Sequence, residues 1–322
     1  MTTDNSTQQI SSWDTFWQNS DSAHAFSDSG ANHPSIQTYW YTFFSELVNK
    51  PMPLQLLDLA SGHGALIDML RNSPQSEQIA VTCLDSSEAA IQHIGERFTD
   101  VKTVLGDAAD TQFDDGQFDV VLSQFGIEYA GQRAFDEAVR TLAPQGTLRV
   151  LLHYTGGSIA GECRRNLALL TTLKESRFLP LAQAFFNAGF AAADGNDRRA
   201  YDQAGADLQP AMRSIENAVQ QGGDLVAADF LEHLYLTTGK IHASFLNYDA
   251  SELNNWLDAM QREADAYSVR MQSMLDAAID EAQFHRLCER LHGQGLTLQQ
   301  AGPLMPNDTN RPLAWALTAV KN

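Results

Sequence analysis

The feature that most constrains this chain is an apolar run that passes through a turn of small residues into a helical pattern. Residues 54–59 predict a short buried strand, and apolar residues spaced three to four apart from Leu66 onward predict a helix. The turn between them contains Gly62 and Gly64, which allow backbone conformations and close approaches that a side chain would block. The helix presents its free N–H groups and positive dipole end at the same point. Such a unit can seat a nucleotide-like ligand.

Three further predicted strands follow, and they end on residues suited to the same ligand. Residues 79–84 predict a second strand that ends at Asp85, about 20 residues beyond the glycines, where a carboxylate can accept both ribose hydroxyls. Residues 101–105 predict a third strand, which ends shortly before Asp107, and residues 118–123 predict a fourth. This repetition argues against the simplest alternative for the glycine turn, a tight connection that binds nothing.

In these landmarks the sequence resembles the class I S-adenosylmethionine-dependent methyltransferases. Their first motif is an acidic residue, an apolar residue and Gly-x-Gly-x-Gly, and residues 58–64 match it with Ala60 in place of the first glycine. Asp85 matches the ribose-binding acid of the family, and Asp107 matches the residue that usually meets the adenine amino group. Two further matches are the fourth strand and the Leu-x-Pro-x-Gly turn before the fifth, at residues 118–121 and 142–148.

The resemblance covers residues 40–155 and, more faintly, the C-terminal end. It implies an α/β fold with a Rossmann-like, doubly wound, mostly parallel seven-stranded sheet whose last strand is antiparallel. It also implies S-adenosyl-L-methionine as cofactor. Ligands of such sheets gather at the carboxyl ends of the strands. The residues expected to bind the cofactor there are Asp58, Ala60, Ser61, Gly62, Gly64, Asp85, Ser86, Asp107, Ala108, Gln124 and Phe125.

A nicotinamide-dependent Rossmann enzyme is the leading alternative, because it shares the glycine turn and the acidic residue. Its fingerprint has a Gly or Ala three residues after the second glycine. That position is Ile67 here, although a shifted register that ends on Ala65 restores the match. Residues 296–301 and 313–321 predict two strands joined by a loop rich in Pro and Asn, which indicates an antiparallel hairpin. A closing antiparallel strand pair is typical of the methyltransferase sheet and favours that family.

The charge balance argues against nucleic acid as a partner. Forty acidic residues against 21 basic ones give a formal net charge of −19, and such a field repels a phosphate backbone. The close basic pairs, at residues 164–165 and 198–199, fall far short of a nucleic-acid-binding patch. We therefore expect a small-molecule acceptor.

The remaining composition predicts a cytoplasmic enzyme without metal or membrane. The three cysteines, Cys83, Cys163 and Cys288, are widely spaced, and no CxxC pair indicates a zinc site or a disulfide framework. No positively charged segment followed by an apolar run is visible near Met1, so we expect no signal peptide. No stretch approaches the roughly 18 apolar residues of a membrane span.

The pattern divides the chain into three parts. Residues 1–50 predict an N-terminal helical segment or lid, residues 51–155 with 294–322 predict the cofactor-binding core, and residues 156–293 predict an inserted helical cap. Within the insertion, residues 192–206 predict a loop. The segments that predict its helices are 160–174, 179–191, 208–221 and 225–245, followed by a long helix from Asp249.

The long helix carries the clearest periodic signal of the insertion. Asp249 is a candidate N-cap with Glu252 three residues on. Apolar residues then recur at alternating gaps of four and three, as in a heptad stripe. The stripe comprises Leu253, Leu257, Met260, Ala264, Tyr267, Met271, Met274 and Ala278. It predicts packing along another helix, either within the insertion or across a homodimer interface.

Aromatic residues crowd the N-terminal part. The simple interpretation is that they belong to helices that cover the sheet. The alternative is a lid over cofactor and acceptor, in which Trp13, Trp17 and Tyr41 are candidates because an aromatic face attracts a sulfonium or ammonium cation.

Methyl transfer by in-line displacement needs mainly alignment and exclusion of water, because the cofactor carries the activated group. A general base is needed only when the acceptor arrives protonated. The candidates are His153, at the end of the fifth strand, and Glu128 and Tyr129, beyond the fourth. The alternative from a different class is a non-catalytic protein that binds S-adenosylmethionine or S-adenosylhomocysteine.

Overall fold

The computed structural model describes the chain except for residues 1–12, 15–16, 18–32, 75, 196–197 and 307–309. The chain forms two compact units, which are described separately. The first contains Met1–Gly161 and Ser273–Asn322, and the second contains Glu162–Gln272.

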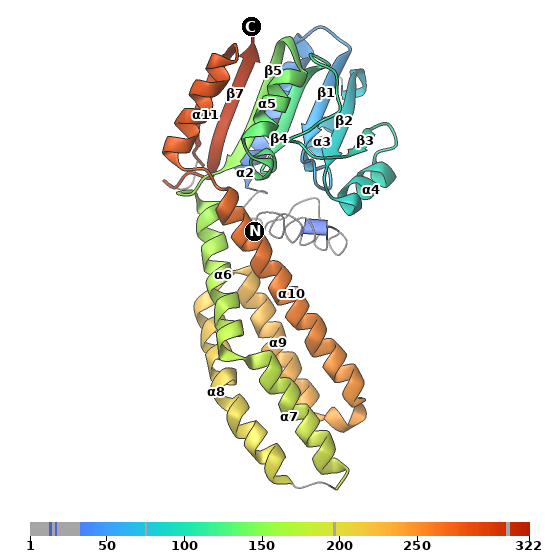
Figure 1. The fold of residues 1–322 in the computed structure, drawn as a ribbon, viewed down its shortest axis with the longest axis vertical. Coiled ribbons are helices and arrows are strands. Elements are labelled where there is room, and N and C mark those ends of the chain that lie inside the picture. Colours follow the sequence, from blue (N-terminus) through green and yellow to red (C-terminus); the bar gives the residue numbers. More distant parts are fainter. Residues whose placement is uncertain (1–12, 15–16, 18–32, 75, 196–197, 307–309) are drawn as a thin grey trace. The chain divides into compact units, whose positions relative to one another are not determined.

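The first unit is built on a seven-stranded sheet with the order β3-β2-β1-β4-β5-β7-β6 in the described part of the chain (Figure 1). Strands β1 to β5 pair in parallel, and β7 runs antiparallel to both β5 and β6. The predicted fold class and its antiparallel last strand are therefore confirmed. The strands are β1 (Leu54–Leu59), β2 (Ile79–Asp85), β3 (Lys102–Leu105), β4 (Phe118–Gln124), β5 (Leu142–His153), β6 (Leu296–Leu304) and β7 (Ala314–Lys321).

Helices cover both faces of this sheet, which explains why its central strands are apolar on both faces. The helices are α2 (Pro34–Glu46), α3 (Ala65–Arg71), α4 (Glu88–Arg97), α5 (Gln132–Thr141) and α11 (Glu281–Gly293), with short 3₁₀ turns η1 (Leu47–Asn49), η2 (Ser76–Gln78) and η3 (Ile127–Ala130). Helices α5 and α11 share one buried cluster with Val150 of β5. Arg149, which immediately precedes Val150 in that strand, contacts α2 instead. Because neighbouring strand residues point to opposite faces, α2 lies on the other side.

Arg149 fastens α2 to the sheet. Its guanidinium lies 3.6 Å from the ring centre of Tyr39 and donates to the Tyr39 carbonyl oxygen at 2.9 Å. It also donates to the Thr318 hydroxyl at 2.9 Å. Burial lowers the pKa of this guanidinium. Four aromatic residues of α2 are buried and serve the core, namely Tyr39, Trp40, Phe43 and Phe44.

The second unit is helical. It holds α7 (Phe178–Ala193), α8 (Arg198–Gly222), α9 (Val226–Ala243), η4 (Phe245–Asn247) and most of α6 (Ser158–Ser176) and α10 (Ala250–Ala277). The predicted loop at residues 192–206 is wrong from residue 198 onward, where α8 begins. Tyr201 explains the difference, because its ring stacks on Phe185 at 4.8 Å and draws this polar segment onto the apolar core as helix. Tertiary packing overrides local composition here.

The long predicted helix is present as α10, and its stripe packs within the chain. Leu253, Leu257 and Ala264 belong to the core of the second unit. The second unit ends at residue 272, short of the predicted boundary at 293. The reason is α11, whose Phe284 stacks on Trp315 of β7 at 4.3 Å and so joins the sheet.

Candidate functional site

The turn after β1 has the strained geometry that its glycines predict. Gly62 and Gly64 have φ values of +52° and +81°, in the region that favours glycine. A Cβ atom on Gly62 would lie 2.8 Å from the Trp17 ring, so a larger residue does not fit there. Ala60 also has a positive φ, of 55°. The Ser61 N–H donates to the Leu84 carbonyl oxygen at 3.2 Å, which ties the turn to the end of β2.

Asp85, at the end of β2, binds the same turn. One carboxylate oxygen accepts the Gly62 N–H at 2.8 Å, and the other accepts the Ser87 N–H at 2.9 Å. Burial raises the pKa of Asp85, and these hydrogen bonds oppose that rise. Each carboxylate oxygen has a second lone pair, so both remain able to accept a further donor such as a ribose hydroxyl.

Asp58 is a second buried carboxylate beside the turn. The residue is 2% exposed, and in the described part of the chain its Oδ2 atom has no hydrogen-bond partner. Burial, and secondarily the charge of Asp85, hold the pKa of Asp58 well above its usual value. Burying a polar atom without a partner costs free energy. A ligand that brings a donor or a positive charge to this position would recover that cost, so the residues present fit the amino-acid and ribose parts of S-adenosylmethionine.

The end of β3 lies next to this pair. The Gly106 N–H donates to the Asp85 carbonyl oxygen at 2.9 Å. Asp107 is exposed, and its carboxylate accepts the Ala109 N–H at 2.8 Å. Ser86 is also exposed, whereas Ala108 is buried in the core. The structure therefore groups the predicted adenine-side residues with Asp85.

The turn after β4 contributes two residues that the sequence analysis missed. A Cβ atom on Gly126 would lie 2.4 Å from Cβ of Ala60, so the two turns touch. Ser123 fixes them, because its hydroxyl donates to the Leu59 carbonyl oxygen at 2.8 Å and accepts the Ile127 N–H at 3.0 Å. The sequence signal is the small residues of Ser-Gln-Phe-Gly at 123–126, which become meaningful once the strand order is known.

The other two residues of this turn differ in their surroundings. Phe125 has a φ of 56°, and its ring lies 4.7 Å from the His153 ring. The Gln124 side chain instead accepts a hydrogen bond from the Trp40 indole of α2. Its amide oxygen is therefore engaged with the helix.

The three predicted catalytic residues lie together at the ends of β4 and β5. One Glu128 oxygen accepts the His153 backbone N–H at 2.8 Å and lies 2.8 Å from Nδ1 of the same histidine. Both side chains are 1% exposed. The Tyr129 ring stands edge-on to the His153 ring at 5.8 Å. The sequence indicated each residue as a separate candidate, and the fold brings Glu128 and His153 into hydrogen-bond contact.

Described residues of the N-terminal segment contact the same strand ends. The Trp17 ring lies 4.4 Å from the His63 ring, and Trp13 stands edge-on to Tyr129 at 5.9 Å. Asp14 accepts the Ser87 hydroxyl at 2.7 Å, at the start of α4. Whether this segment is a lid stays a prediction. Tyr41, the third lid candidate, lies on α2 and is 39% exposed.

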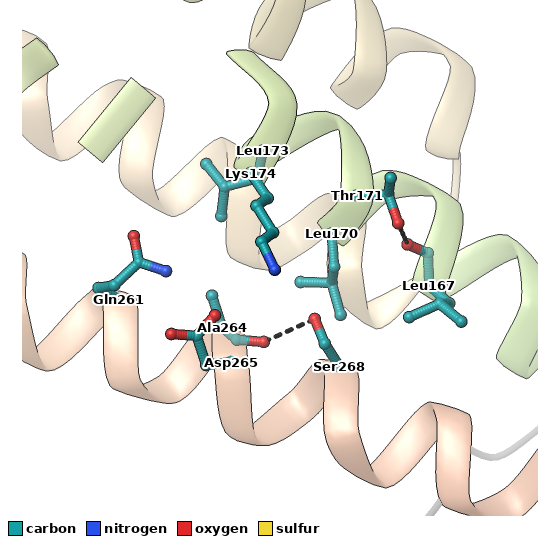
Figure 2. A pocket seen from close by; sticks show the side chains of 9 residues that line it. All are labelled: Leu167, Leu170, Thr171, Leu173, Lys174, Gln261, Ala264, Asp265 and Ser268. Atoms are coloured by element: carbon teal, nitrogen blue, oxygen red, sulfur yellow. Dashed lines mark hydrogen bonds between the residues drawn. The ribbon is translucent and has the colours of Figure 1, made fainter. Parts of the chain in front are cut away.

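A separate hollow lies between α6 and α10 within the second unit (Figure 2). Leu170, Leu173 and Ala264 are its buried apolar lining, and Lys174 and Asp265 are exposed at its edge. None of the predicted cofactor-binding residues lines it.

Two absences concern the described ranges of the chain. No group of three or more His, Cys, Asp or Glu side chains there could hold a metal ion. No helix there has the length and apolar character needed to cross a membrane.

One part of the chain is similar to a known protein family. Residues 56–146 match the family model described as a methyltransferase domain. The demethylmenaquinone methyltransferase of Thermotoga maritima is 30% identical over 118 residues, which are 36% of this chain and 51% of that protein. The enzyme of the same name from Thermus thermophilus is 33% identical over 116 residues, or 35% of this chain and 53% of that protein. The chain thus spans about half the length of these curated relatives.

Solved structures give a weaker likeness. A SAM-dependent methyltransferase from Aquifex aeolicus has a TM-score of 0.33 and 16% identity, and covers 40% of this chain and 74% of its own. The plantazolicin methyltransferase BpumL, solved with SAH, has a TM-score of 0.48 and 11% identity over 98% of this chain and 96% of its own.

Proposed function

We propose that this chain carries a class I S-adenosylmethionine-dependent methyltransferase domain and transfers a methyl group from S-adenosylmethionine to a small-molecule acceptor. The observation that carries the proposal is the pair of buried carboxylates at the glycine turn. Asp85 binds the Gly62 N–H, and Asp58 beside it has a buried oxygen without a partner in the described chain. S-adenosylmethionine, when bound, supplies an activated methyl group on a sulfonium centre.

The residues that would hold this cofactor follow from their places in the crevice. The turn at Gly62 and Gly64, with Ala60 and Ser61, would seat the amino-acid tail close to Asp58. Asp85, followed by Ser86, would accept the ribose hydroxyls, and Asp107 with Ala108 would border the adenine. Phe125 and Gln124, after β4, would lie on the side where the acceptor enters. These roles extend the family resemblance and are supported by the contacts among β1, β2 and β3.

Two observations support a small molecule as acceptor. The net charge of −19 disfavours a polyanion such as RNA or DNA. The two curated relatives are named for demethylmenaquinone, a small organic acceptor. The part that this chain plays is to align the acceptor with the methyl group and to exclude water.

The helical insertion is proposed to select the acceptor, with residues 51–155 and 294–322 as the core and residues 1–50 as the lid. Replacement of Glu162–Gln272, the compact second unit, by a short linker tests this role. Continued methylation of the same acceptor would show that the insertion does not select it. A homodimer through the insertion and a cytoplasmic location stay predictions.

Tritium transfer tests the proposed function. The full chain is incubated with methyl-tritiated S-adenosylmethionine and a metabolite extract, and the small-molecule fraction is counted. Tritium in a new small molecule supports methyltransferase activity on a small-molecule acceptor. Tight cofactor binding without any transfer would support a non-catalytic sensor instead, and tritium found only in added RNA or protein would contradict the small-molecule class. Protein without added cofactor and extract without protein serve as controls.

A further inference from the structure

The histidine–carboxylate pair comes from neighbouring strand ends. Strands β4 and β5 are parallel neighbours, with Gln124 opposite Leu151, so their carboxyl ends meet at one edge. Glu128 lies on η3, directly after β4, and His153 is the last residue of β5. The result is a nearly fully buried acid and imidazole joined through one carboxylate oxygen, beside the turn that touches Ala60.

The hydrogen-bond pattern defines which ring nitrogen carries the hydrogen. An ionised carboxylate only accepts hydrogen bonds. Oε1 of Glu128 already accepts the His153 backbone N–H, and Nδ1 lies 2.8 Å from the same oxygen. Nδ1–H is therefore the donor to Glu128, and Nε2 is the basic nitrogen of the neutral ring. A carboxylate that orients an imidazole in this way is a recurring arrangement in catalytic sites.

The second oxygen of Glu128 adds an independent observation. Oε2 is buried and has no hydrogen-bond partner within the described residues. Buried carboxylate oxygens normally receive a donor, because leaving one unpaired is costly. A ligand that brings a second donor group, besides the hydrogen that Nε2 accepts, would satisfy it.

We infer that His153 is the general base of the methyl transfer, that Glu128 is its positioning residue, and that the acceptor atom carries a proton before it reacts. The inference rests on the proposed function and narrows its substrate class to compounds whose reacting atom bears an acidic hydrogen. A thioether or a tertiary amine needs no base and would leave the pair without a role.

The proposed methyl transfer is a nucleophilic displacement at the methyl carbon. The acceptor atom gives its proton to Nε2 of His153 and forms a bond to the methyl carbon. The carbon–sulfur bond breaks, and its electron pair stays on sulfur. The imidazolium is held by the Glu128 carboxylate until it releases the proton to water.

Two aromatic rings pack against His153. The ring centres of Phe125 and Tyr129 lie 4.7 and 5.8 Å from the centre of the imidazole ring. Apolar rings beside the imidazole help to exclude water from it.

One substitution in the full chain tests the role of His153 as general base, and a second one serves as its control. His153→Gln should lower tritium transfer at least about 100-fold, as expected for the loss of a general base. Wild-type transfer should fall as the pH is lowered, because a protonated imidazole accepts no proton, and the residual transfer of His153→Gln should lack that fall. His285→Gln, which changes an exposed histidine on α11, is the matched control and should behave as wild type. Cofactor affinity, measured by calorimetry, should stay within about twofold in all variants, because cofactor binding does not need the base.

A direct readout of the pair needs no acceptor. Long-range ¹⁵N correlation spectra should show hydrogen on Nδ1 of His153 in the wild type and a changed tautomer population in Glu128→Gln. Wild-type hydrogen on Nε2 would overturn the inference. So would a folded His153→Gln variant with the wild-type rate and pH profile, or one that loses transfer only in parallel with cofactor affinity. Absence of any wild-type transfer, with the Nδ1 tautomer present, would contradict the proposed function rather than the arrangement of the pair.

Discussion

Gly126 packs directly against Ala60, so that a Cβ atom on Gly126 would be 2.4 Å from Cβ of Ala60 and 2.9 Å from its carbonyl oxygen. The two residues come from the turns that follow β1 and β4, which are neighbouring strands. Because the obstacle includes backbone, neither turn can yield by rotating a side chain. This contact joins the cofactor side of the crevice to the side that holds Glu128 and His153.

Gly126→Ala should therefore lower the free energy of unfolding by about 1–3 kcal/mol, the usual cost of overpacking. The turn after β1 should shift as well, and cofactor affinity should fall. Chemical denaturation and calorimetry measure the two effects. Gly161→Ala is the matched control, because nothing lies within 4 Å of its added Cβ atom. It lies in a helix, where Ala is favoured over Gly. Equal effects of the two substitutions would disprove the close contact.

Asp58→Asn should make the free protein more stable near neutral pH while weakening cofactor binding. The folded-state pKa of Asp58 is raised by burial and by Asp85. The folded protein therefore loses stability as the pH rises through the ordinary carboxyl range towards that raised value. The Asp58→Asn substitution removes the cost of burying a carboxylate. It also removes the negative charge that would attract the ammonium group of a ligand. A denaturation series against pH, with calorimetry at neutral pH, measures both. A less stable variant with unchanged affinity would show that Asp58 is a structural residue.

For Glu137 we expect the opposite dependence of folding stability on pH. Hydrogen bonds from Arg140, and secondarily from Thr111, lower the pKa of Glu137 to about 2. Since the folded-state pKa lies below the ordinary value of 4.5, this carboxylate stabilises the fold above pH 4.5. That stabilisation is lost as the pH falls from 4.5 towards 2. Glu137→Gln should flatten the slope of unfolding free energy against pH in this window. An unchanged slope would mean that the ion pair is not formed in solution.

The strands could be predicted because their signal is local. Four of the six residues 54–59 are leucine, and β1 has the predicted bounds. The C-terminal hairpin, predicted from two strand-like segments and a turn-rich loop, is likewise present with antiparallel pairing. The predicted family and cofactor type agree with the family model matched at residues 56–146.

What the sequence did not reveal depends on contacts between distant segments. Glu128 and His153 are 25 residues apart, and nothing in either neighbourhood indicates that one carboxylate meets both the backbone and the ring of the other. The importance of Gly126 depends on its contact with Ala60, and the hydrogen bond from Trp40 of α2 to the Gln124 amide oxygen also joins distant segments. The start of α8 was missed for the same reason, since the packing of Tyr201 on Phe185 outweighs a polar, turn-like composition.

Calorimetric titration of S-adenosylmethionine into the wild type and Asp85→Ala tests the central claim most directly. The claim is that the adenosyl group lies at the ends of β1 and β2 with its ribose held by Asp85. Loss of the carboxylate should weaken binding more than tenfold, since hydrogen bonds to a charged group contribute about 1.5–3 kcal/mol. Asp110→Ala, an exposed aspartate near the same strand ends, controls for the change in net charge. Equal affinities of wild type and Asp85→Ala, or no binding by the wild type, would contradict the account.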